Sequence, residues 1–302
     1  MIHYKIFTIP IILILLIIII NFSSNYIKEP FVNVKSVNSI NNIWMYWENK
    51  KNMTKPNYLS LCFDTVQKHC RKKFNIFLLD EVSVYKYLPD LRKDLDKKLS
   101  IQQKSDYIRY YLLYKYGGIW LDSDTIIMND LTSIVKHLEY YDFVGFGCHY
   151  GDVVCKRVKS GKPYPANWVM ASVKNGKLMG KCLEYCDNIL KNPYIRLHTN
   201  YFVIGRTLMW KMIKRLKSSN WDYYHYPSKC LERDSSGNKL RNNRSISNES
   251  IDKKCKNHYL FIPIYNTAPG FPNWFINMSK KELLSSNMLI SKLFRKSLNI
   301  NF

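Results

Sequence analysis

Residues 100–124, SIQQKSDYIRYYLLYKYGGIWLDSD, decide the fold. Ser100 followed by Gln103 has the pattern of a capping box, and apolar residues then recur at helical spacing. Gly117 and Gly118 come at the point where a helix of this kind stops. The pattern predicts a capped helix that ends in a glycine turn immediately before a strand.

Charged residues flank the glycine turn on both sides. Asp106 and Arg109 lie one turn apart on one face of the predicted helix. The residues after the turn predict a strand that ends in acid. If the strand persists that far, its period of two places Trp120, Asp122 and Asp124 on one side and the aliphatic residues between them on the other.

A strand–helix–strand unit precedes this stretch. Residues 43–47, IWMYW, predict a buried strand, Pro56 opens a helix, and residues 74–79 predict a second strand. Strand and helix patterns keep alternating after residue 126. The alternation predicts an α/β fold, a single Rossmann-type domain with a mostly parallel central sheet, in which ligands bind at the carboxyl ends of the strands.

An almost unbroken apolar run at residues 6–20 precedes this domain. With its flanks it approaches the ~17 to 25 residues that cross a bilayer, and no clear cleavage site follows it. Residues 1–22 therefore predict a signal anchor, a transmembrane helix, and residues 23–41 a stem. Residues 42–302 form the predicted domain, with a long loop at 228–257. The weak basic bias before the run favours a single-pass type II protein with its domain in a lumen, such as that of the Golgi or endoplasmic reticulum.

The composition limits the class of function. With 46% hydrophobic and 15% aromatic residues and only 11 glycines, the chain can bury a sizeable core and is neither collagen-like nor disordered. Lys and Arg number 46 against 23 Asp and Glu, a net charge of +23, which raises nucleic acid, anionic membrane or phosphate-bearing substrates as partners. Because no block of five consecutive basic residues occurs, we interpret the charge as a solvated surface and expect no nucleic acid.

Eight cysteines and four glycosylation sequons agree with a lumenal domain. The pairable cysteines are Cys62 with Cys70, Cys148 with Cys155, and Cys230 with Cys255. Spacing alone does not fix which of them form disulfides.

Asp122 and Asp124 place two carboxylates close together, which is costly unless a cation is present. Carboxylate oxygens and substrate phosphates are the usual ligands of Mg²⁺ or Mn²⁺, and such an ion would neutralise a leaving diphosphate. A strand followed by this acidic pair also suits an aspartyl-phosphate phosphohydrolase, in which one acid is the nucleophile.

The string from Lys104 to Asp124 closely resembles the signature of DXD-containing sugar transferases. These families include the capsular polysaccharide synthesis proteins, the initiating α-1,6-mannosyltransferases and, more distantly, the glucosylating bacterial toxins. The strand at 43–47 resembles their first strand, and the resemblance extends loosely to about residue 275. It implies a GT-A-like fold, a nucleotide-sugar donor such as a UDP- or GDP-hexose, and Mn²⁺ or Mg²⁺.

The resemblance also implies roles for individual residues. Asp122 and Asp124 match the metal-binding pair, with Asp124 the more direct ligand and Asp122 also touching ribose or sugar. Asp106 and Arg109 match helix residues that contact ribose and the donor sugar, which makes Arg109 a candidate catalytic residue together with the acidic pair. The matching aromatic residues are Trp44, near the donor base, and Trp120, at the edge of the pocket.

The C-terminal half departs from the family pattern. Where the family supplies a His or Ser near a Trp as a further metal or diphosphate contact, the nearest match is Asn273-Trp274. Asn167-Trp168 resembles the strand that faces the acceptor pocket.

The apolar run and the resemblance together predict a membrane-anchored, metal-dependent glycosyltransferase that moves a hexose to a glycan, lipid-linked or protein-linked acceptor, and the resemblance implies that it retains the anomeric configuration. An acceptor hydroxyl would attack the anomeric carbon as the nucleoside diphosphate leaves, with electrostatic stabilisation as the main catalytic effect. The alternatives are the phosphohydrolase and a catalytically inactive, anchored carbohydrate-binding protein.

Overall fold

The computed structural model describes residues 41–49, 54–146, 165–192, 194, 197, 203–226, 260–264 and 272–301. The chain divides into two units, Met1–Lys35 and Ser36–Phe302, and every described residue belongs to the second. The predicted transmembrane segment at 1–22, almost all of the stem and the loop at 228–257 therefore lie outside the described residues. Within the described part, no helix is long and apolar enough to span a membrane.

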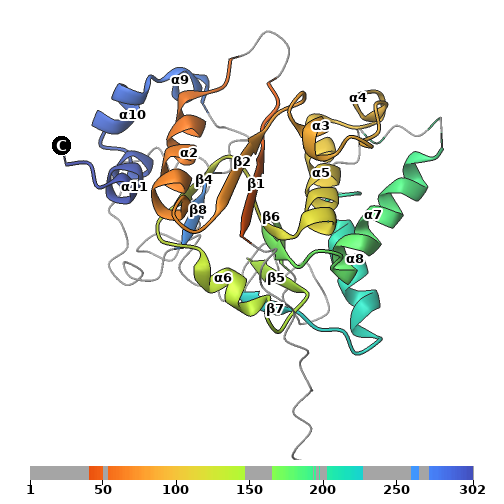
Figure 1. Ribbon diagram of the computed structural model, residues 1–302. Helices are drawn as coiled ribbons and strands as arrows, with labels where there is room; N and C mark the ends of the chain where they lie inside the picture. The colour runs from red at the N-terminus through yellow and green to blue at the C-terminus, as the bar shows by residue number, and fades with distance from the viewer. Residues whose placement is uncertain are drawn as a thin grey trace, which may run out of the picture. The chain divides into compact units, whose positions relative to one another are not determined.

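A six-stranded sheet forms the centre of the second unit, in the order β2-β1-β3-β6-β5-β7 (Figure 1). Its strands are β1 (Asn42–Tyr46), β2 (Asn75–Leu79), β3 (Gly118–Leu121), β5 (Phe143–Phe146), β6 (Ala166–Ser172) and β7 (Tyr224–Tyr226). β1 pairs in parallel with β2 and β3, and β5 in parallel with β7, whereas β6 is antiparallel to both β3 and β5. The predicted mostly parallel sheet of an α/β fold is thus confirmed, with β6 as the strand that runs the other way.

The strand order reverses at β1. After helix α2 (Asn57–Cys70) the chain places β2 on one side of β1, and after helix α5 (Ile101–Tyr116) it places β3 on the other side. Two short helices, α3 (Val84–Tyr87) and α4 (Leu95–Lys98), lie between β2 and α5. In open α/β sheets, ligands bind at the carboxyl ends of strands where the order reverses, so the ends of β1 and β3 are the expected site.

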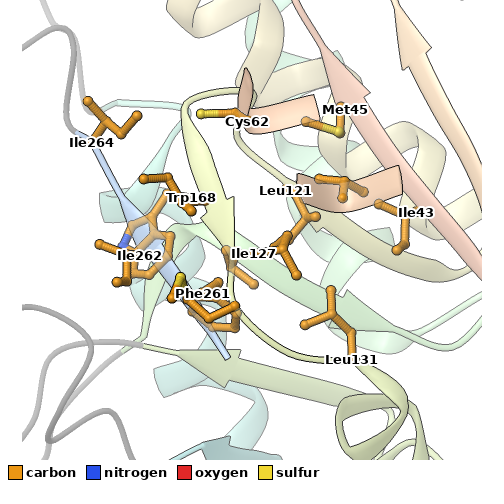
Figure 2. Close-up of a cluster of buried hydrophobic side chains, with 14 of the residues drawn as sticks. Ile43, Met45, Cys62, Leu121, Ile127, Leu131, Trp168, Phe261, Ile262 and Ile264 are labelled. Atoms are coloured by element: carbon orange, nitrogen blue, oxygen red, sulfur yellow. The ribbon is translucent and has the colours of Figure 1, made fainter. Parts of the chain in front are cut away.

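The side chains of β1 and β3 alternate between two hydrophobic clusters, as the period of two predicts. Ile43, Met45 and Leu121 belong to the cluster that contains Cys62 of α2. Figure 2 shows this cluster, which also takes in residues of β4 (Thr125–Ile127) and β8 (Phe261–Pro263). The other cluster, packed against α5, contains three aromatic residues of the two strands: Trp44, Tyr46 and Trp120.

Helix α5 begins and ends where the sequence predicts. The Gln103 amide donates to Ser100 Oγ at 3.3 Å, and the Ser100 amide donates to Gln103 Oε1 at 3.0 Å. The helix stops at Gly117 and Gly118, whose φ angles are 71° and 105°, a region that favours glycine. A side chain at Gly118 would overlap the backbone of Asn42 in β1. The glycine pair therefore lets the chain turn from the helix directly into β3.

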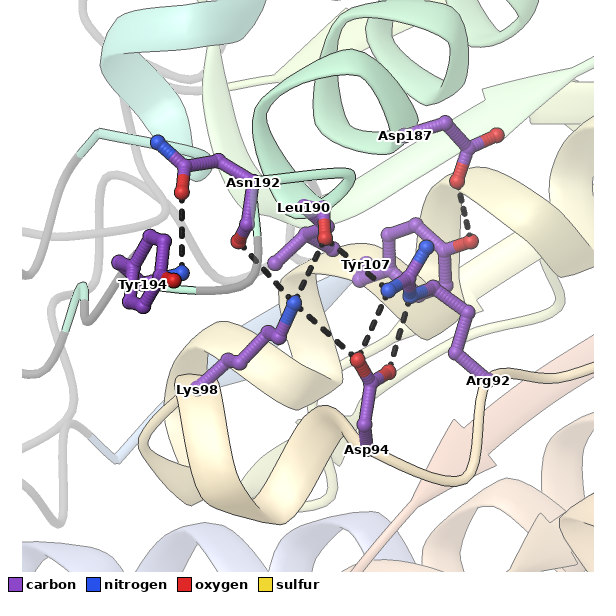
Figure 3. Close-up of polar contacts among 8 residues, drawn as sticks. All are labelled: Arg92, Asp94, Lys98, Tyr107, Asp187, Leu190, Asn192 and Tyr194. Carbon is purple, nitrogen blue, oxygen red and sulfur yellow. Dashed lines mark hydrogen bonds and ion pairs between the residues drawn. The ribbon is translucent and has the colours of Figure 1, made fainter.

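Polar contacts attach the outer side of α5 to helix α7 (Lys177–Leu190) (Figure 3). Tyr107 of α5 donates to Asp187 at 2.6 Å. Lys98 of α4 is buried, and its Nζ donates to the carbonyl oxygens of Leu190 at 2.8 Å and Asn192 at 3.2 Å while pairing with Asp94 at 3.1 Å. A cation is thus placed on the carbonyl end of α7, where the helix dipole favours it. Helix α8 (Arg206–Lys217) packs against α7 in turn.

The remaining elements lie on the α2 side of the sheet. β4 and β8 pair antiparallel as a separate two-stranded sheet. Helices α9 (Asn273–Asn277), α10 (Lys280–Ser285) and α11 (Leu289–Leu298) contact α2, and α6 (Thr132–His137) connects β4 to β5. Cys62 and Cys70 are buried free thiols, so the suggested pairing between them is not formed, and the other two pairs lie outside the described residues.

We predict that Lys98→Met destabilises the fold by about 1 to 3 kcal/mol, because it removes the buried donor to two carbonyl oxygens. Lys93→Met, which removes an exposed lysine of the same segment, is the matched control and should change stability by less than about 0.5 kcal/mol. Urea unfolding followed by circular dichroism measures both values. Equal effects of the two substitutions would show that the Lys98 contacts contribute nothing.

Candidate functional site

The acidic pair lies on a turn at the carboxyl end of β3. The strand ends at Leu121, so the expectation that it continues to Asp124 is wrong. Ser123 between the two acids donates its hydroxyl to the Tyr46 carbonyl of β1 at 2.9 Å, and the Asp122 amide donates to the Trp168 carbonyl of β6 at 2.8 Å. The turn is therefore fixed to both neighbouring strands, at the point where the strand order reverses.

Arg109 of α5 joins the helix to this turn. Its Nη2 lies 3.1 Å from Asp106 Oδ1 and 3.2 Å from Asp122 Oδ1, and its side chain is only 5% exposed. Its Nη1 donates to the carbonyl of Asn167 in β6. The guanidinium is thus a buried cation shared by two carboxylates, and the structure brings together three residues that the sequence predicted for the site.

Trp120 lies beneath the same cluster. Its Nε1 donates to Asp122 Oδ1 at 2.8 Å, and the Arg109 guanidinium lies 4.9 Å from its ring centroid. This contact confirms the predicted common side for Trp120 and Asp122, and it does not extend to Asp124, the third residue of that prediction. Trp120 is fully buried, so it supports the carboxylate from behind and does not form the edge of a pocket.

Neighbouring residues enclose both oxygens of the Asp106 carboxylate. Asn167 Nδ2 donates to Asp106 Oδ1 at 2.7 Å, and a methyl group at Gly205, which caps the start of α8, would overlap Asp106 Oδ2. Tyr110 of α5 donates to the Gly205 carbonyl at 3.0 Å and holds that backbone in place. The sequence relates Asn167 to the acceptor pocket, whereas the structure shows Asn167 in contact with Asp106 and Arg109 of α5.

Burial governs the ionisation of the two carboxylates in contact with Arg109. Burial is the main cause that raises the pKa of Asp106 from 3.8 to about 6. The charge of Arg109 and the hydrogen bond from Asn167 lower this pKa, whereas the charge of Asp122 raises it further. Burial also raises the pKa of Asp122, against the charge of Arg109 and the Trp120 hydrogen bond. The charge of the single guanidinium therefore does not offset the effect of burial on the pKa of either acid.

Asp124 has different neighbours from Asp122. Its carbonyl accepts from the Ile264 amide at 2.9 Å, which ties the turn to the segment after β8. The charge of Asp124 adds to burial in raising the pKa of the Cys62 thiol on α2. Asp122 and Asp124 are both partly exposed, with Asp122 facing α5. The turn thus carries two acidic side chains in a chain of net charge +23.

The donor set of the turn fits a hard divalent ion. Carboxylate oxygens are the ligands that Mg²⁺ and Mn²⁺ prefer, and these ions are commonly held by one or two carboxylates together with substrate phosphates. In the described part of the chain, no group of three or more His, Cys, Asp or Glu side chains is placed to hold a metal.

Trp44 is not part of this cluster. It is 1% exposed, donates from Nε1 to the Gly117 carbonyl at 2.9 Å, and stacks on Phe77 with ring centroids 4.4 Å apart. Tyr87 and Tyr116 pack around the same ring. This position does not favour the predicted contact with a donor base, because the ring faces are already covered.

Asn273 and Trp274 are at the exposed start of α9, with Trp274 54% exposed. The adjacent Phe275 is buried and packs 5.2 Å from Tyr58 of α2. Their predicted contact with metal or diphosphate stays a prediction, because residues 265–271, which lead into α9, lie outside the described part.

Sequence reasoning missed a second ionic cluster at the end of β1. Lys104 of α5 is buried and pairs with Glu48 at 3.0 Å and with Asp96 at 2.8 Å. Tyr46 donates its hydroxyl to Glu48 Oε2 at 2.6 Å. No local pattern marked this cluster, because residues two apart on a helix, such as Lys104 and Asp106, do not share a face.

Comparisons with solved structures find sugar transferases at low identity. The PaToxG glycosyltransferase is 16% identical over 67% of this chain and 78% of that chain, with a TM-score of 0.41. A glycosyltransferase involved in the glycosylation of the major capsid of PBCV-1 is 13% identical over 75% of this chain and 93% of that chain, with a TM-score of 0.41. Mouse xyloside xylosyltransferase 1 is 10% identical over 65% and 87%, with a TM-score of 0.38.

Among curated proteins, none matches this sequence. The family described as capsular polysaccharide synthesis protein matches residues 13–232, which is well over half of the chain. The match confirms the family suggested by the string around the glycine turn. The chain belongs to the capsular polysaccharide synthesis protein family.

Proposed function

We propose that this protein is a divalent-metal-dependent, retaining glycosyltransferase that transfers a hexose from a UDP- or GDP-sugar to a glycan acceptor. One observation carries the proposal: at the strand-order reversal of a strongly basic protein, Asp122 and Asp124 bring two negative charges onto one turn, and Asp122 shares the buried Arg109 with Asp106. A local charge of that sign favours a bound cation, and a cation at this edge of the sheet favours a diphosphate.

Asp122 and Asp124 would hold the ion, with the remaining ligands supplied by the donor phosphates. When bound, Mn²⁺ or Mg²⁺ neutralises negative charge on a leaving diphosphate. Arg109 does not serve this purpose, because it is already paired with Asp106 and Asp122.

The chain's own residues orient the reaction. Arg109 on α5 and Trp120 on β3 both contact Asp122 Oδ1, and together they fix the position of this carboxylate. An acceptor hydroxyl attacks the anomeric carbon of the donor while the bond to the diphosphate breaks, and the hydroxyl proton passes to a departing phosphate oxygen. Attack on the face that the diphosphate leaves retains the anomeric configuration. This route needs no free carboxylate as a base. It agrees with a site in which Arg109 and the proposed metal ion bind the acids, and in which fixed charges stabilise the transition state.

The same proposal includes a single membrane anchor at residues 1–22 and a lumenal catalytic domain. The apolar run and the sequons of the sequence support it. The acceptor would then be a glycan, free or linked to lipid or protein, on that side of the membrane.

Replacing Asp124 tests the function directly. Asp124→Asn keeps the size of the side chain but removes a charge from the proposed ion site, so Mn²⁺-dependent hydrolysis of the nucleotide sugar should fall at least about a hundredfold. The assay screens UDP- and GDP-hexoses with the full chain in detergent. Asp222→Asn, which alters an exposed acid near the end of α8, is the control. Full hydrolysis by folded Asp124→Asn would refute the proposal, and release of phosphate from simple esters would favour the phosphohydrolase.

Gly205→Ala tests the enclosure of Asp106. The added methyl group overlaps Asp106 Oδ2, so the carboxylate and with it Arg109 must shift. We expect transfer activity to fall about tenfold or more, since small displacements of positioned groups cost large factors in rate. Gly180→Ala on α7, where the new methyl group meets only the Tyr114 ring, should retain activity. Unchanged activity in Gly205→Ala would mean that the position of Asp106 does not matter.

The raised pKa of Asp106 predicts a pH dependence of stability. Between about pH 4 and pH 6 the unfolded chain releases this proton while the folded protein keeps it, so the Asp106 contribution to the unfolding free energy falls as pH rises. The loss should be about 2 to 3 kcal/mol across this window. The stability difference between wild type and Asp106→Asn, measured in chelator at both ends of the window, reports it. A difference that is the same at both pH values contradicts the assignment.

A further inference from the structure

The cluster at the end of β1 is a second built polar site beside the first. Glu48 is 14% exposed at its side chain, and Lys104, which pairs with it, is 5% exposed. Both hydrogen-bonding partners of the Glu48 carboxylate in the described part of the chain, Tyr46 and Lys104, engage Oε2. The carboxylate is therefore held rigidly by one oxygen, and its other oxygen, Oε1, can accept hydrogen bonds from a ligand.

This cluster borders the acidic turn. Tyr46, which donates to Glu48 with its hydroxyl, accepts with its carbonyl from Ser123 in that turn. Lys104 lies on α5 two residues before Asp106. Glu48 and the Asp122–Asp124 turn thus follow two neighbouring parallel strands at the same edge of the sheet, where β1 and β3 pair.

A nucleoside diphosphate bound at this edge needs an acceptor for its ribose hydroxyls. Asp106 does not supply one, because Asn167 and Arg109 occupy its Oδ1 and the backbone of Gly205 closes off its Oδ2. An acidic side chain at the end of a strand commonly accepts from a ribose hydroxyl in nucleotide sites of α/β sheets. Glu48 has the charge, the position and the fixed geometry for this contact.

We infer that Glu48 Oε1 accepts a hydrogen bond from a ribose hydroxyl of the donor, which makes Glu48 a residue that selects ribonucleotides over deoxyribonucleotides. The inference rests on the proposed function, since it places the nucleoside beside the same turn. Lys104 and Tyr46 are positioning residues in this account: they act on the ligand only by fixing Glu48.

The test compares ribose and deoxyribose ligands with wild type and Glu48→Gln. In the variant, Lys104 and Tyr46 turn the amide oxygen toward themselves, so the amide nitrogen replaces Oε1 and the charged acceptor is lost. Calorimetric titration of the full chain in detergent with Mn²⁺ uses UDP, GDP and their 2′-deoxy and 3′-deoxy forms. Wild type should bind the ribonucleotide about tenfold or more tightly than the form that lacks the contacted hydroxyl. This ratio of affinities corresponds to the free energy of one hydrogen bond to a charged group.

Glu48→Gln should lose that preference by weakening the ribonucleotide alone. Glu184→Gln, an exposed acid on α7 paired only with a surface lysine, should keep it. Tyr46→Phe retains the buried ring and should reduce the preference in part, which provides a second variant if Glu48→Gln folds poorly. Equal weakening of ribo and deoxy ligands, or a wild type without preference, overturns the inference while leaving the proposed function intact. A wild type that binds none of these nucleotides overturns both.

Discussion

The site depends on one buried guanidinium shared by two carboxylates. Arg109 meets Asp106 on its own helix and Asp122 on the turn after β3, in surroundings that exclude most water. Removing a single partner from such a group leaves a desolvated charge unpaired, which is strongly destabilising. Several nearby elements keep these groups in contact. The capping box and the glycine pair fix the two ends of α5, and β6 supplies the Asn167 carbonyl to Arg109. Helix α8 begins at Gly205, which leaves room for Asp106.

Local and overall charge have opposite signs in this protein. The chain carries +23, yet the two clusters at the strand-order reversal contain more acids than bases. A basic surface attracts phosphorylated ligands from a distance, whereas the acidic turn can hold a phosphate only through a cation. This combination agrees with the charged nucleotide-sugar donor of the proposed function.

Local signals in the sequence were sufficient for much of the fold. The capping box, the glycine stop and the alternation in β1 and β3 are short-range patterns, and each is present in the structure. The end of β3 at Leu121 was not predictable from local pattern, and the turn that follows is held by the bond from Ser123 to Tyr46, which is distant in sequence. The burial of Trp44 and the antiparallel direction of β6 are likewise set by packing between elements. For the same reason Asp106, Arg109 and Asp122 could be named from their pattern, while the contacts of Asn167 and Gly205 with Asp106, and the pairing of Glu48 with Lys104, could not.

The ion at the acidic turn is the central claim, and pulsed electron paramagnetic resonance of bound Mn²⁺ tests it most directly. With UDP or GDP present, the account predicts phosphorus hyperfine coupling on Mn²⁺ bound to the wild-type protein, beyond that of the nucleotide complex in buffer. It also predicts that the protein-bound signal disappears when Asp122 and Asp124 are both replaced by Asn. A protein-bound signal without phosphorus coupling, or one that survives the double replacement, would contradict the account.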